Sequence, residues 1–444
     1  MRYPLVPTLA LCAAAAAHAA DPVTALDQAV AELPRPPAPV ASPERSGEPK
    51  LRLIDLSLAV VGVAGLSTAT DAELESLNAG GHDPHRRGFT LQTAELSLSG
   101  AVDPYFTAEA HIAASPEHGV ELEEAYITTT SLPYGLEAKA GYQLIEFGRV
   151  NASHAHAWSW IEQPVVASRL LGGDGSRAPG ARLACLLPAT WYSQVSVGAY
   201  NADDASMASF QGEAGHDHEH EGEDEAERTI GGRLREEELT TGSAADLAYL
   251  VRWENSGSLG GTEVKLGLSW LTGPNASGVG MRSDLYGADL VVASKPSSGP
   301  FNSVKAVVEV MYRSAEVPET AETGEDATDP ADDFIAPADT LTDWGLYAQV
   351  ELGLAERWSV GLRGEYATAS GDSADHAGMI DHDEDAMRDT RIRVSPLVAF
   401  RPSEFSRLRL QYDYDRAEHL EDGTAHSVWL GLDVLLGAHP AHGF

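Results

Sequence analysis

The densest group of metal-binding side chains is an alternating run of His216, His218 and His220, separated by Asp217 and Glu219. Imidazole nitrogens and carboxylate oxygens are ligands that zinc and other borderline divalent cations accept. A His-x-His-x-His run in a polar segment lacks the spacing of a closed tetrahedral site, so it predicts weak, exchangeable binding of a divalent metal such as zinc. The alternative is a polar low-complexity loop with incidental histidines.

A second group consists of charged side chains that alternate with apolar ones, which puts all the charges of a strand on one face. In the C-terminal part of the chain this face is basic, and near the start of the chain it is mainly acidic. Charges of opposite sign on two arcs of a water-filled lumen would favour small polar solutes. The alternative is that they pair across neighbouring strands and stiffen the wall. The candidate channel-lining residues are Arg363, Arg391, Arg393, Arg407, Arg409, Glu95, Glu109, Glu121, Glu137 and Lys139.

Positioning such faces requires long strands, and about sixteen stretches show the required alternation of period two. The pattern predicts an all-β fold, a transmembrane antiparallel β-barrel of about sixteen strands. A barrel of this size leaves room for an aqueous channel. The expected strands are 51–64, 89–101, 104–114, 119–130, 135–145, 178–188, 190–201, 244–254, 261–272, 282–294, 302–314, 341–353, 356–368, 389–400, 404–416 and 424–436.

The connections between these strands are alternately short and long, as in barrels with short periplasmic turns and long outer loops. The segments 255–261 and 295–302 are among the short ones. The formal net charge of −37 is concentrated in 203–238, 316–339 and 372–389, which fall in predicted outer loops. An acidic rim of this kind is either a solvating surface or a device that concentrates cations, and it excludes nucleic acid as a partner.

Residues 1–20 read as a signal peptide, because Arg2 precedes an apolar run that ends in small residues. Residues 21–50 are expected to form a short helix and a proline-rich periplasmic linker, and 51–444 the outer-membrane barrel. Thirty residues are too few for a plug domain, which favours a passive channel. The expected location is the outer membrane of a Gram-negative bacterium.

The layout resembles the sixteen-stranded porins of Gram-negative outer membranes, whose third outer loop folds inward and narrows the channel. The corresponding segment here is 145–177, which is more apolar and less acidic than the other long loops. We therefore expect it to pack within the barrel mouth. The histidines of this segment either contribute to the constriction or hydrogen-bond the backbone around it. Its candidate constriction residues are Glu146, Arg149, His154, His156, Trp158 and Asp174.

Three short sequences also resemble a branch of porin-like proteins associated with zinc-regulated outer-membrane receptors. They span 81–90, 100–106 and 154–158. The terminal Phe444 is similar to the end of barrels that the barrel assembly machinery recognises. The porin resemblance further implies contact with outer-membrane lipid and association into a homotrimer.

These features favour a porin-like channel for passive diffusion of small polar solutes or ions. The alternative is a zinc-recruiting channel or receptor barrel that uses its histidine-rich and acidic outer loops. No nucleophile-elbow, metalloprotease or nucleotide-binding motif is present in the sequence, so no enzymatic activity and no cofactor beyond weakly bound metal is expected.

Overall fold

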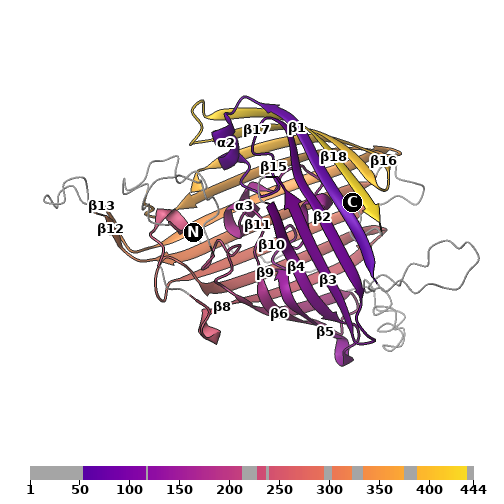
Figure 1. Cartoon of the computed structure of the whole chain (residues 1–444), viewed down its shortest axis with the longest axis horizontal. Coiled ribbons are helices and arrows are strands. Elements are labelled where there is room, and N and C mark those ends of the chain that lie inside the picture. The colour runs from indigo at the N-terminus through magenta and orange to yellow at the C-terminus, as the bar shows by residue number, and fades with distance from the viewer. Residues whose placement is uncertain are drawn as a thin grey trace, which may run out of the picture.

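The computed structural model describes residues 54–116, 119–212, 228–236, 240–294, 303–322, 334–374 and 388–437. These residues form a closed barrel of sixteen strands (Figure 1). Each strand is antiparallel to both neighbours, and pairing of β1 (Asp55–Ser67) with β18 (Thr424–Gly437) closes the barrel. In the same ranges, no helix is both long enough and apolar enough to cross a membrane.

The other fourteen wall strands are β2 (Gly88–Ala101), β3 (Phe106–Ser115), β4 (Gly119–Thr129), β5 (Leu136–Leu144), β6 (Arg177–Leu186), β7 (Tyr192–Asn201), β8 (Leu247–Leu259), β9 (Thr262–Pro274), β10 (Arg282–Ser294), β11 (Val304–Val317), β14 (Asp339–Ala355), β15 (Trp358–Ser370), β16 (Arg391–Ser403) and β17 (Ser406–Ala417). The remaining elements lie in the connections and are β12 (Thr320–Glu322), β13 (Phe334–Ala336), α2 (Asp71–Leu77), α3 (Val165–Leu171), and the 3₁₀ turns Pro133–Gly135, Ala155–Ala157, Ile230–Gly232 and Ala244–Asp246.

The alternation of side chains sorts the two faces of the wall. On β18, Leu430 is 50 % exposed on the outer face, whereas its neighbour Trp429 is 1 % exposed on the inner face. Leu410 on β17 pairs with Leu430 and is likewise exposed outward. Apolar rows of this kind recur around the barrel, so its outer surface suits lipid and its inner surface carries the polar groups.

All sixteen expected strands are present, within a few residues of their predicted bounds. The expected turn at 255–261 is present but shorter than predicted, because β8 continues to Leu259 and leaves only Gly260 and Gly261 as the turn. Both glycines have positive φ, at 60° and 86°, which a two-residue hairpin that follows the strand twist requires. The expected connection 295–302 lies outside the described residues. The β12–β13 hairpin was not predicted.

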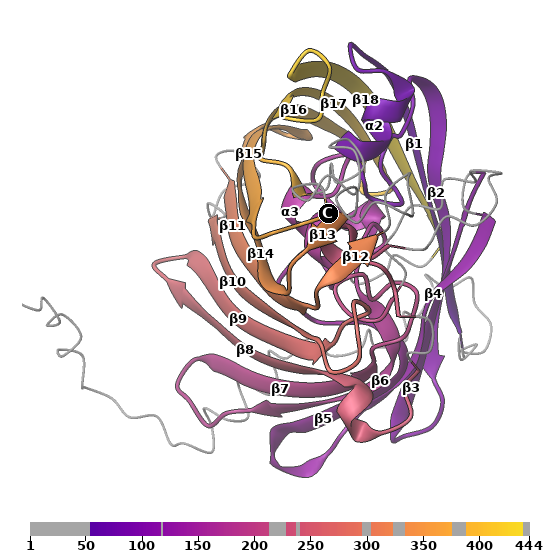
Figure 2. The same ribbon diagram turned by 90° about the vertical axis from the view of Figure 1, so that its left-hand side faces the viewer.

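Two outer connections turn into the barrel rather than away from it. The helix α3 lies within the ring of strands (Figure 2), and all seven of its residues are buried. The helix α2 begins with a capping box, in which Thr70 and Glu73 exchange hydrogen bonds, and it buries Leu74 and Leu77. Neither helix was predicted from the alternating pattern, since both belong to connections.

Candidate functional site: a barrel narrowed by an inward loop

The segment 145–176, called here the inward loop, leaves β5 and crosses the interior to the opposite wall. Gly148 donates its N–H to Ser269 Oγ on β9 at 3.1 Å, and Arg149 donates its N–H to Glu309 Oε1 on β11 at 2.7 Å. Gly148 has a φ of 63°, and a Cβ there would lie 1.8 Å from Glu309 Oε1. Only glycine therefore fits where the loop meets this wall.

Apolar packing fixes the loop in the interior. Phe147, Val166 and Leu170 are at most 1 % exposed and belong to one cluster with side chains of the barrel wall. The wall members include Leu250, Leu271, Leu285, Met311 and Tyr347. The apolar composition of this loop thus serves burial inside the barrel, which is where its composition predicts it to lie.

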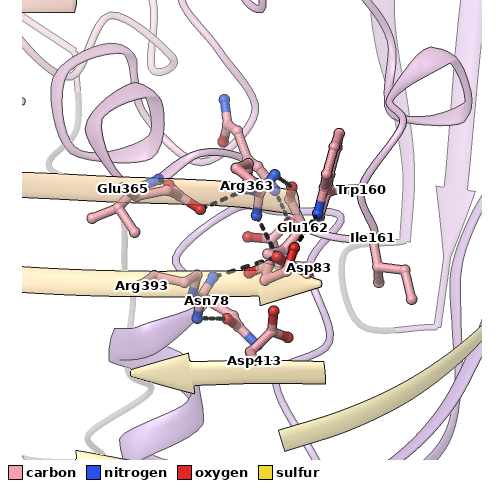
Figure 3. A network of polar contacts seen from close by, with 12 residues as sticks. Asn78, Asp83, Trp160, Ile161, Glu162, Arg363, Glu365, Arg393 and Asp413 are labelled. Atoms are coloured by element: carbon pink, nitrogen blue, oxygen red, sulfur yellow. Dashed lines mark hydrogen bonds and ion pairs between the residues drawn. The ribbon is translucent and has the colours of Figure 1, made fainter. Parts of the chain in front are cut away.

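Glu162 connects the inward loop to the arginine-bearing wall (Figure 3). Its carboxylate accepts hydrogen bonds from Arg363 on β15 and from Gln411 Nε2 on β17, the latter at 2.5 and 2.6 Å. Nearby, Trp160 Nε1 donates to the carbonyl oxygen of Ser395 at 2.9 Å. These bonds join residues about two hundred positions apart, so the loop is held by the completed barrel.

The five arginines predicted to line the channel point into the barrel, but they are at most 5 % exposed. Each is paired with a carboxylate: Arg391 and Arg393 with Asp415, Arg407 and Arg409 with Asp433, and Arg363 with Glu162 and Glu365.

The same arginines donate to backbone carbonyls of the loops. Arg409 bonds to Trp160 at 2.6 Å, Arg407 to His156 at 3.1 Å and Arg393 to Leu77 at 3.1 Å. In this structure these side chains therefore anchor the inward loop and the first outer loop (residues 68–87), and they are covered by them.

The acidic arc, on β2, β3 and β4, carries a cluster of histidines and glutamates. Glu95 on β2 lies 3.1 Å from His111 Nδ1 on β3, and 2.8 Å from His156 Nδ1 on the inward loop. His154 reaches Glu123 at 3.1 Å and Glu124 at 3.0 Å, both on β4. The structure thus brings the predicted His154, His156 and Glu95 together. The alternative prediction was that His154 and His156 hydrogen-bond the backbone, but the contacts described here join both histidines to carboxylates.

A β-bulge explains why two successive glutamates reach the interior. His111 and Ile112 on β3 are paired with Glu124 and Leu122 on β4, so Glu123 has no partner in the ladder. The extra residue turns both Glu123 and Glu124 inward, and each is at most 5 % exposed. Alternation alone cannot predict this arrangement, because the bulge shifts the phase by one residue.

The remaining predicted site residues are spread around the interior. Glu121 pairs with Arg177, Glu137 and Glu146 pair with Arg182, and Lys139 lies 3.6 Å from Glu124. Arg149 pairs with Glu254 and Asp289. Glu109 accepts from Tyr126 Oη, and Trp158 Nε1 donates to the Ser153 carbonyl. Asp174 lines a cavity between the inward loop and the acidic arc, together with His82, Glu123, His154 and Trp158.

Buried loop residues near these contacts have shifted pKa values. Burial disfavours a charged His82, but its hydrogen bond to Glu123 outweighs this and raises the pKa of His82 to about 9. Burial and the nearby charge of Glu162 raise the pKa of Asp83 to about 8. Asp83 accepts the N–H of Gln163 at 2.8 Å, and so joins the first outer loop to the inward loop.

Sequence reasoning missed His82, Asp83, His111 and Glu162. His111 is two positions from Glu109 on β3, so the alternation of the strand puts both on the inner face, and the sequence could have indicated His111. The other three lie in loops, where no periodicity indicates direction. His216, His218 and His220, together with the signal, linker and Phe444 predictions, lie outside the described residues.

The closed sixteen-stranded barrel and its apolar outer face define the porin-type barrel of Gram-negative outer membranes, and place the chain in that membrane. The fold is similar to the outer membrane channel DcaP of Acinetobacter baumannii, with a TM-score of 0.52, 12 % identity, and coverage of 86 % of this chain and 97 % of that one. It is also similar to the anion-selective porin from Comamonas acidovorans, with a TM-score of 0.50, 8 % identity, and coverage of 86 % and 99 %.

In sequence, an uncharacterized protein of Aquifex aeolicus (strain VF5) is 29 % identical over 399 residues, which cover 84 % of this chain and 76 % of that protein. No protein-family model matches the chain. The structural similarities, at such low identity, establish the shared fold.

Proposed function

We propose that this protein is a porin-like channel, without enzymatic activity, for passive diffusion of small polar solutes or ions across the outer membrane. The observation that carries the proposal is a wide barrel whose interior is crossed by one loop, which is bonded to Glu309 on β11 and, across the barrel, to Glu95 on β2. Sixteen strands enclose more space than their own side chains fill. A loop fixed inside such a barrel narrows the channel through it without blocking the channel.

The charges that remain partly exposed in the interior favour polar solutes. The side chains of Glu137, Glu146, Arg149 and Glu254 are between 24 % and 43 % exposed, and both signs are represented. Hydrated charges of both signs attract small ions and dipolar molecules and repel apolar ones. Because the arginines of the opposite arc are covered, these side chains are the better candidates to contact solutes.

Planar-bilayer recording tests the proposal directly. Purified full-length protein, shown to be folded by heat-modifiable gel mobility, is expected to give discrete, ohmic conductance steps. The steps should be small, because two loops occupy the interior. A folded barrel that inserts into the bilayer and gives no conductance at any voltage contradicts the proposal.

A zinc-recruiting channel is the second candidate, and the buried cluster of histidines and glutamates on β2, β3, β4 and the inward loop favours it. In this version the run from His216 to His220 captures the metal weakly at the outer rim. Slower growth of a knockout strain under zinc limitation, reversed by the wild-type gene, supports this candidate. Normal growth favours the general channel.

The proposed partners follow from the porin resemblance. Lipid covers the apolar belt, the barrel assembly machinery inserts the chain, and three barrels associate into a homotrimer. Native mass measurement in mild detergent is expected to give three times the mass of the mature chain, and a monomer alone would contradict the trimer.

A further inference from the structure

The cluster around Glu95 has the composition and spacing of a metal site. Ligand atoms of Glu95, His111 and His154 all lie within 4.8 Å of one another. The three residues come from β2, β3 and the inward loop, and each is at most 9 % exposed. Two rigid strands and a loop held from the far wall therefore fix three ligating groups around one point.

The distances are close to those that a bound ion needs. Tetrahedral zinc with ligand distances of about 2.0 to 2.2 Å places its ligand atoms about 3.3 to 3.6 Å from one another. Glu95 Oε1 is 3.1 Å from His111 Nδ1, and Glu95 Oε2 is 3.7 Å from His154 Nδ1. Side-chain rotations of modest size would bring these atoms onto one ion.

A further ligand is at hand. His156 is 2 % exposed and places Nδ1 2.8 Å from Glu95 Oε2, while its Nε2 is buried without a hydrogen-bond partner. A buried polar nitrogen without a partner is rare and costs free energy unless something binds it. Rotation of the His156 ring would offer a third imidazole ligand. A bound cation would then give the buried Nε2 of His156 the partner that it lacks.

The charge of the cluster also calls for a cation. Glu123 is paired with His82 and Glu124 with Lys139, whereas the close partners of the buried Glu95 are three imidazoles. Burying ionised carboxylates is costly unless positive charge compensates them. A divalent ion bound by neutral imidazoles supplies this charge. The cavity lined by His82, Glu123 and His154 adjoins the cluster.

We propose that Glu95, His111 and His154 form a binding site for a borderline divalent cation such as zinc, on the wall of the lumen beneath the inward loop. The site deepens the proposed function, since it makes such cations a solute class that the barrel recognises. It uses none of the three histidines of the run from His216 to His220. Two imidazoles and a carboxylate select zinc, cobalt or nickel over magnesium and calcium, which prefer oxygen ligands.

Cobalt titration of purified protein in detergent tests the site. The starting variant lacks residues 213–227, so that His216, His218 and His220 do not contribute. After treatment with chelator it is expected to bind one Co²⁺ per chain, with visible absorption bands that zinc abolishes and magnesium leaves unchanged. In this background, His111→Gln and His154→Gln should each weaken binding by about 100-fold or more.

The matched control is His419→Gln, which alters another buried histidine, paired with Asp389 at 3.0 Å outside the cluster. It should bind cobalt like the starting variant. A folded His154→Gln protein with unchanged affinity overturns the proposal. If the glutamine variants do not fold, X-ray absorption of the cobalt-loaded starting variant decides, because at least two imidazole ligands are expected and one or none contradicts the site.

These measurements do not depend on conductance. A barrel that binds cobalt but does not conduct keeps the metal site and contradicts the channel. A barrel that conducts but does not bind cobalt keeps the channel and contradicts the site.

Discussion

At the scale of single residues, the inward loop is attached to the barrel by a small number of buried ion pairs. Glu162 is 1 % exposed and contacts Arg363 and Gln411. Arg363 has a second partner in Glu365, at 2.7 Å. Breaking a buried ion pair is costly because the remaining charge stays in a low-dielectric surrounding. The free energy of these contacts therefore opposes detachment of the loop.

Replacing Glu162 with Gln keeps the size of this side chain and removes its charge. Loss of one partner of a buried pair costs roughly 3 to 5 kcal/mol, and we expect the cost to fall on attachment of the loop, since the wall strands remain paired. Single-channel conductance should rise, and the loop should become sensitive to protease. The control is Glu263→Gln, whose pair with Lys265 is well exposed and contributes little. Conductance and cleavage equal to wild type in Glu162→Gln would contradict the anchoring role.

The positions of the arginines were predictable from the sequence, but their task was not. Arg391, Arg393, Arg407 and Arg409 lie on the polar face because alternation fixes which side of the wall each occupies. Whether such a side chain meets water or a loop depends on residues far away in the chain. Glu162 and Arg363 are separated by 201 positions, and no local pattern links them.

At the scale of elements, the wall strands depend on one face being apolar and the other polar. On β8, Val251 is 39 % exposed on the outer face, while Ser256 lies on the inner face with Arg252 and Glu254. A change of the same chemistry on the two faces therefore meets lipid in one case and the wet interior in the other.

Val251→Arg is expected to destabilise the barrel by roughly 2 to 4 kcal/mol, the penalty for arginine facing lipid near the bilayer midplane. Ser256→Arg, the matched control on the same strand, should cost far less because its guanidinium reaches water. Urea titration in lipid vesicles, followed by heat-modifiable gel mobility, measures both. Equal midpoints for the two variants would show that the faces have been assigned wrongly.

The strands were predictable because each one carries its own alternation, whereas the bulge on β4 and the path of the inward loop were not. A bulge adds one residue and reverses the phase beyond it, so Glu123 and Glu124 both face inward against the simple rule. The helices α2 and α3 lie in connections, and their burial depends on the wall that receives them.

At the scale of the whole molecule, the two-residue turns lie at one end of the barrel and the longest connections at the other. In antiparallel strands joined in sequence order, successive connections alternate between the two ends, so each end has its own set of connections. The turn at Gly260 and Gly261 joins β8 to β9 and belongs to the short set. The acidic segments that supply most of the net negative charge belong to the long set.

This arrangement predicts what is accessible on intact cells. A protease site inserted at residue 222 or 325, both in acidic outer segments, should be cleaved by protease added outside, whereas one inserted between Gly260 and Gly261 should be cleaved only after the outer membrane is permeabilised. Heat-modifiable mobility before digestion confirms that each variant has folded. Cleavage between Gly260 and Gly261 on intact cells would contradict this topology and show that the barrel has the opposite orientation in the membrane. It would place the acidic segments on the periplasmic side, so the cations that they attract would enter the barrel from within the cell envelope.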